Sequence, residues 1–149
     1  MNWSEFSESR IGDMNWESDH KAGKNIFCYL PNNHYLAFKM FYKGAQTANI
    51  EFGILSEYQT GYEKEQHIRM VVRVKEALAP FVENNVLSYG DDSFVIGFDK
   101  QDTYFVIKPP KQGRYNRRYN FNEIEQAFAE FQERLEKSGL KAKLMEICR

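Results

Sequence analysis

The sequence has few cysteines, little net charge and no long apolar run. Its 149 residues include two cysteines, and 20 basic against 21 acidic side chains leave a formal net charge of −1. Two cysteines are too few for a disulfide scaffold, and the balanced charge excludes a histone-like polyelectrolyte. No apolar run approaches the roughly 18 residues of a membrane span, and residues 1–10 lack the apolar core of a secretory signal. We therefore predict a cytoplasmic protein with no membrane partner.

Aromatic residues, in contrast, are abundant. The chain has 2 Trp, 9 Tyr and 12 Phe but only 4 Pro and 9 Gly, a composition typical of a folded protein with an aromatic core. Cys28 lies within an alternating apolar pattern, and Cys148 lies in an apolar C-terminal stretch. We predict that both are buried as small hydrophobic side chains.

Apolar residues alternate with a period of two in two separate regions of the chain. Strands are predicted at 25–30, 35–42 and 48–55, and again at 86–89, 94–98 and 103–108. A shift of 60 residues places 25–29 on 85–89 and 36–38 on 96–98, with mostly conservative pairs. Two interpretations stay open: an internal duplication, or the ordinary similarity of two alternating hairpins.

A helical pattern follows each set of strands. The first helix is predicted to begin at Thr60, with Glu63 three residues on, and Pro80 is expected to kink it or to begin a separate last turn. The second helix has Asn120 or Asn122 as its cap and ends at Gly139. Residues 140–148 are predicted to close the chain as a strand.

Together these patterns predict an α+β fold. We expect an antiparallel sheet built from two βββα halves, 25–84 and 85–149, with two long helices on one face. Residues 25–149 then form a single domain. Residues 1–24 are acidic and rich in aromatics, and we expect them to form a short helix that docks on the core.

The strongest local signal is a basic and aromatic loop at 108–121, which contains five basic residues, three aromatics and no acid. Lysine and arginine neutralise phosphates and tyrosine rings stack on bases, so this composition is typical of a nucleic-acid contact. The predicted binding residues are Lys108, Lys111, Arg114, Tyr115, Arg117, Arg118 and Tyr119. Two other interpretations stay open: a solvated connection whose arginines pair with the following acidic helix, or a contact for an acidic protein partner.

The order of a helix, three strands, a helix and a further strand resembles the core of the PD-(D/E)XK nucleases. That resemblance implies an Asp on the second strand and Glu-x-Lys on the third, which together hold Mg²⁺ and orient water. Here the strand at 35–42 has no acid, and the third strand has Glu51 followed at the lysine position by Gly53. We therefore predict no metal-dependent cleavage, and Asp99 and Asp102 are assigned to a turn.

Other motifs point to no cofactor or metal. His20, His34 and His67 have no zinc-ligand spacing, and no glycine-rich phosphate loop or nucleophile elbow is present. Arg69 and Arg73 lie one turn apart on the first long helix and are interpreted as solvated charges.

These observations favour a small, non-catalytic binding module. It would act on nucleic acid, or on a protein of a nucleic-acid-processing machine, through the loop at 108–121. The alternative is a stoichiometric protein inhibitor, such as an immunity protein or a phage-encoded blocker of a defence enzyme, because aromatic and arginine residues dominate protein interfaces. The third alternative is a degenerate PD-(D/E)XK-like fold without a catalytic site. The sequence does not determine the oligomeric state.

Overall fold

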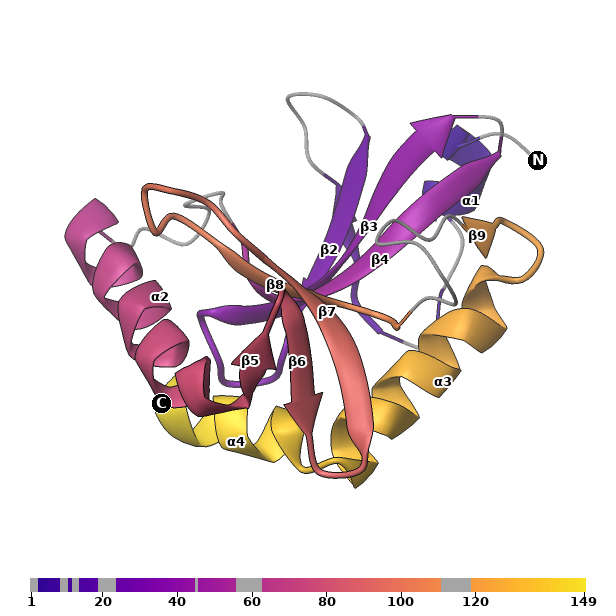
Figure 1. The fold of residues 1–149 in the computed structure, drawn as a ribbon. Helices are drawn as coiled ribbons and strands as arrows, with labels where there is room; N and C mark the ends of the chain where they lie inside the picture. The colour runs from indigo at the N-terminus through magenta and orange to yellow at the C-terminus, as the bar shows by residue number, and fades with distance from the viewer. Residues whose placement is uncertain are drawn as a thin grey trace.

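A computed structural model of the chain describes residues 3–8, 11, 14–18, 24–44, 46–55, 63–110 and 119–149 (Figure 1). The described helices are α1 (Trp3–Glu8), α2 (Lys64–Leu78), the 3-10 turn η1 (Ala79–Phe81), α3 (Ile124–Lys137) and α4 (Leu140–Ile147). The described strands are β1 (Glu17–Ser18), β2 (Asn25–Tyr29), β3 (Leu36–Gly44), β4 (Thr47–Ile54), β5 (Val82–Glu83), β6 (Val86–Tyr89), β7 (Asp92–Phe98), β8 (Phe105–Lys108) and β9 (Tyr119–Asn120).

The strands form one nine-stranded sheet with the order β1-β2-β3-β4-β8-β7-β6-β5, and β9 pairs with β4. Every pairing among the described strands is antiparallel. Two meanders, β2-β3-β4 and β6-β7-β8, meet through their third strands, so β4 and β8 lie side by side at the centre. The predicted α+β fold with an antiparallel sheet is therefore confirmed, whereas the internal duplication stays a prediction.

The main core lies between the sheet and the helices. Figure 1 shows α2, α4 and α3 following one another along one side of the sheet. Their buried residues join the strand residues Phe38, Phe52 and Phe105 in a single apolar cluster. The Phe38 and Phe52 rings lie 4.5 Å apart between centroids, and Phe128 of α3 packs edge-on against Phe38 at 5.0 Å. Period-two alternation in the strands supplies one apolar face, which the helices cover.

The two long helices lie where the helical spacing predicts them, but α3 begins at Ile124 with Glu123 as its N-cap, so the predicted cap at Asn120 or Asn122 is wrong. The buried residues of α3 are Ile124, Phe128, Phe131 and Leu135, as the helical spacing predicts. Pro80 lies in η1, a separate turn after α2, because it has no N–H with which to continue the helix. The expected start at Thr60 lies outside the described residues, and α2 begins at Lys64.

The C-terminal segment is a helix, and the prediction of a strand at 140–148 is wrong. Leu140, Leu144 and Cys148 are buried and recur every four residues, so they form one face of α4 against the core. Leu140 and Leu144 are four residues apart, and this spacing fits the alternation of a strand as well as the turn of a helix. The prediction of a strand followed from this ambiguity. Gly139 has a φ of 82° and ends α3, as expected, but the chain then turns into a second helix.

The N-terminal residues pack on the core through aromatic contacts. Phe6 of α1 stacks on Phe121, with ring centroids 4.6 Å apart and an interplanar angle of 5°. Trp16 packs edge-on against Phe128, and its indole N–H donates to the Ile11 carbonyl oxygen at 2.7 Å. These contacts bury Phe6 and Ile11 although the surrounding sequence is acidic.

Two further expectations concern cysteine and membranes. Cys28 and Cys148 are both buried and neither forms a disulfide, as predicted. Within the described residues, no helix has the length and apolar character needed to cross a bilayer.

Candidate functional site

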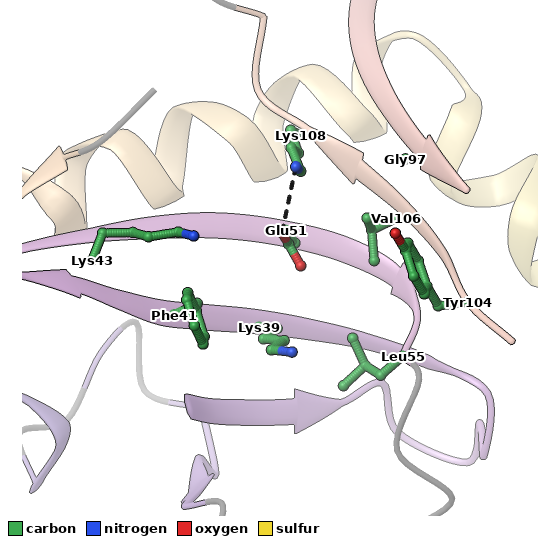
Figure 2. A pocket seen from close by; sticks show the side chains of 9 residues that line it. All are labelled: Lys39, Phe41, Lys43, Glu51, Leu55, Gly97, Tyr104, Val106 and Lys108. Carbon is green, nitrogen blue, oxygen red and sulfur yellow. Dashed lines mark ion pairs between the residues drawn. The ribbon is translucent and has the colours of Figure 1, made fainter. Parts of the chain in front are cut away.

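A small hollow lies on the face of the sheet opposite the helices. A small cluster of buried apolar residues on this face consists of Phe27, Ala37, Leu55 and Val106, and none of them belongs to a helix. The hollow has a volume of about 230 Å³ (Figure 2). Its polar and aromatic residues are Lys39, Phe41, Lys43, Glu51, Tyr104 and Lys108, and its apolar residues are Leu55, Gly97 and Val106. We call these nine residues the lysine hollow.

Three neighbouring strands place the charged groups. Lys39 and Phe41 lie two residues apart on β3 and so share a face, and Lys43, at an irregularity near the end of β3, lines the same hollow. Glu51 on β4 is the cross-strand partner of Lys39, and Lys108 at the end of β8 extends toward Glu51 from the other side. The Lys108 Nζ lies 3.8 Å from the Glu51 Oε1. Three lysines and one glutamate give the lysine hollow a formal charge of +2.

Phe41 orients the two lysines of β3. The Lys43 Nζ lies 4.6 Å from the centroid of the Phe41 ring, and the Lys39 Nζ lies 5.7 Å from it. Both distances are typical of cation–π contacts, in which the negative face of the ring attracts the ammonium group. In Figure 2 the Lys43 side chain extends along β4 toward Glu51. Phe41 therefore holds two like charges close together on one strand.

A tight turn positions Tyr104 on the far side of the hollow. The Asp99 carboxylate accepts hydrogen bonds from the Tyr104 N–H at 3.1 Å and the Thr103 N–H at 2.7 Å, and also from the Thr103 hydroxyl. Burial raises the pKa of Asp99, but these hydrogen bonds outweigh it and hold the pKa below the ordinary value of 3.8. The assignment of Asp99 to a turn is thus confirmed, and His67 of α2 secures the same turn by donating to the Thr103 carbonyl oxygen at 2.6 Å.

Gly53 and Gly97 are both cross-strand partners of Val106, which lines the hollow. Gly53 on β4 has a φ of 154°, and a Cβ atom there would overlap the Phe105 carbonyl oxygen of β8. At Gly97 a Cβ atom would meet the Val106 side chain at 3.2 Å. A side chain at Gly53 would force β4 and β8 apart, and a side chain at Gly97 would press on Val106.

The predicted loop residues divide into three groups. Lys108 lies in the lysine hollow. Tyr119 is 6% exposed and its ring belongs to the main core, which leaves no open face for a stacked base. Lys111, Arg114, Tyr115, Arg117 and Arg118 lie outside the described residues.

Lys108, which precedes the segment 111–118, and Tyr119, which follows it, both contact β4. On one side Lys108 is paired with Glu51, and on the other Tyr119 is the cross-strand partner of Ala48. In the sequence, the segment 111–118 between these two residues contains four further basic residues and no acid.

Lys39, Lys43 and Tyr104 were not predicted from the sequence. The signal for the first two was present, because a Lys-x-Phe-x-Lys pattern in a strand places all three side chains on one face. Tyr104 had no comparable signal, since its position depends on the pairing of β8 with β4, which are distant in sequence.

The positions implied by the nuclease resemblance carry no acidic cluster. The Glu51 carboxylate lies beside lysine, and the expected lysine position is Gly53. Within the described parts of the chain, no three histidine, cysteine, aspartate or glutamate side chains are grouped as a metal site would require. No protein-family model, curated protein or solved structure was found to match the chain.

Proposed function

We propose that this chain is a non-catalytic binding module for single-stranded nucleic acid, which contacts its ligand through the lysine hollow and the basic residues of 111–118. The observation that carries the proposal is the grouping of Lys39, Lys43 and Lys108 on one face of the sheet beside an aromatic ring. Ammonium groups neutralise backbone phosphates and release counterions, which drives association.

The shape of the hollow favours an unpaired strand. A volume of about 230 Å³ accepts one phosphate or one base but not the width of a duplex. Tyr104 offers a ring at the far side, and stacking on such a ring requires a base that is free of its partner. The ring of Phe41 already contacts two lysines, so its role is to orient charge rather than to stack.

We also propose that the protein works in the cytoplasm. Both cysteines are buried as free thiols, so they form no disulfide that an oxidising compartment would maintain. Nucleic acid is accessible in this compartment.

The test is a titration of labelled single-stranded DNA and RNA oligonucleotides at increasing KCl concentration. The double variant Lys39→Gln/Lys43→Gln should bind more weakly, and its salt slope should fall by about 1.4, because each lost phosphate contact contributes about 0.7 on a single strand. The control Lys64→Gln/Lys143→Gln removes the same charge from helices on the other side of the sheet and should leave both quantities unchanged.

Two outcomes would contradict the proposal. One is equal binding by the two double variants, which would mean that only net charge matters. The other is tight capture of a single host protein that nuclease treatment leaves unchanged, which would favour a protein inhibitor.

A further inference from the structure

A second basic cleft lies away from the lysine hollow, between α2, the turn that joins β2 to β3, and the end of α4. Its volume is about 530 Å³, within the range of small-molecule sites. Its hydrogen-bonding side chains include Arg69, Arg73, Arg149, His34, Tyr35 and Gln66. Among the residues that the structure describes, no acidic side chain lines this cleft.

The arginines come from separate segments and converge on one space. Arg69 and Arg73 lie four residues apart on α2 and so share a face of the helix, while Arg149 follows α4. Arg69 has one partner, Glu65, at 3.4 Å, in a pair whose side chains are 73% and 80% exposed. Such an exposed pair is weak. The described part of the chain supplies no ion-pair partner for Arg73.

The wall opposite α2 is held in place by Asn33. The Asn33 Oδ1 accepts hydrogen bonds from the Tyr35 N–H at 2.9 Å and the Leu36 N–H at 2.8 Å. Its Nδ2 donates to the Cys148 carbonyl oxygen at 3.1 Å. The Asn33 side chain therefore links the β2–β3 turn to the end of α4. This link fixes the separation of the two segments that lie opposite Arg69 and Arg73 of α2.

From this arrangement we infer that the cleft binds the terminal phosphate of a nucleotide-sized ligand, either a free nucleotide or the end of a nucleic-acid strand. Each guanidinium presents paired N–H donors that match phosphate oxygens, and three arginines that line one cleft with no acidic side chain in its described lining favour an anionic ligand. A carboxylate accepts fewer hydrogen bonds than this set offers, whereas a terminal phosphate has three oxygens and close to two charges. Tyr35 and Met70 in the cleft wall provide apolar contact for the attached group.

This inference does not rest on the proposed function of the lysine hollow, because the two sites share no residue. The test uses the full chain and measures the shift in thermal unfolding temperature with inorganic pyrophosphate, adenosine 5′-monophosphate and potassium chloride at matched ionic strength. A ligand that binds only the folded state raises the unfolding temperature. We expect a rise with the two phosphate compounds and none with chloride.

Two sets of variants identify the site. Arg69→Gln/Arg73→Gln should lower the affinity on the order of a hundredfold, because it removes two charge-assisted donors. Lys64→Gln on the same helix serves as the charge control and should bind as the wild type does. Gln66→Glu places a carboxylate in the cleft and should also abolish the shift, whereas Gln101→Glu, in an exposed turn, should not.

The source of the phosphate is distinguished by oligonucleotides with and without a 5′-phosphate. A preference of about tenfold or more for the phosphorylated oligonucleotide, lost in Arg69→Gln/Arg73→Gln, supports a nucleic-acid end. Binding of the mononucleotide without such a preference supports a free nucleotide. The inference is overturned if neither phosphate compound shifts the wild type, or if the arginine variant and Lys64→Gln respond equally.

Discussion

The Glu51 carboxylate lies 3.8 Å from the Lys108 ammonium group, at the point where β8 ends and the basic segment begins. Lys39 lies opposite Glu51 on the neighbouring strand, so this carboxylate is the one negative charge of the lysine hollow. Its negative charge reduces the repulsion between the lysines when no ligand is bound. The same charge repels an anion that enters the hollow.

Replacing Glu51 by glutamine should therefore strengthen nucleic-acid binding. A unit charge at about 4 Å contributes about 1 kcal/mol in a solvated site, which corresponds to roughly fivefold in affinity. Oligonucleotide titration at low salt measures the effect. The matched control is Glu76→Gln on α2, which makes the same change in net charge outside the hollow. Weaker binding by Glu51→Gln than by its control would show that the lysine hollow does not contact the ligand.

Gly53 should tolerate no side chain. In Gly53→Ala the new methyl group overlaps the Phe105 carbonyl oxygen, so β4 and β8 must separate at the centre of the sheet. We expect a loss of about 3 kcal/mol in the free energy of unfolding, measured by urea denaturation. Gly44→Ala is the control, because Gly44 has a φ of 85° with no atom near the added Cβ. It should lose only about 1 kcal/mol, and an equal loss in both variants would mean that backbone conformation alone matters.

Asp99 should make stability depend on pH below about pH 4. Its pKa in the folded state is below the ordinary value of 3.8, so its contribution is present above that value and is lost as the pH falls through the folded pKa. Asp99→Asn keeps an oxygen acceptor but carries no charge. Urea midpoints of the two proteins between pH 7 and pH 3 should differ at neutral pH and converge in acid. A constant difference would show that the charge of Asp99 contributes nothing.

Cys148 should be unreactive in the folded protein. Burial raises its pKa to about 12, although the Arg73 guanidinium acts in the opposite direction, so at pH 8 about one thiol in ten thousand is ionised. Iodoacetamide labelling followed by mass spectrometry should be slow in buffer and fast in urea. Because the folded pKa lies above the ordinary value of 9.0, stability should also fall as the pH rises above 9. Rapid labelling under native conditions would contradict both expectations.

Most of the fold was predictable because local patterns agreed with it. Alternation of apolar residues located the strands, and the spacing of Phe128 and Phe131 identified the inner face of α3. The C-terminal segment was misassigned because its leucines satisfy the periods of both a helix and a strand over a short stretch. Packing of Leu140 and Leu144 against the core selects the helix over the strand.

The candidate site was predictable only in part. Lys108 was identified from the composition of its loop, but Tyr119 from the same loop proved to be a core residue. The sequence predicted that its ring stacks on a base, because composition does not distinguish a buried tyrosine from an exposed one. Pairing with Ala48 on β4 turns it inward.

By itself, the sequence determined the antiparallel α+β class, the buried thiols of Cys28 and Cys148, and the basic character of 108–121, because each follows from local periodicity or composition. The tertiary structure decided which charges lie together. Lys39 and Lys108 are 69 positions apart and become neighbours of Glu51 only because β4 pairs with β3 on one side and β8 on the other. Local patterns cannot specify such a site, since it depends on strand order, and strand order is set by how the whole core packs.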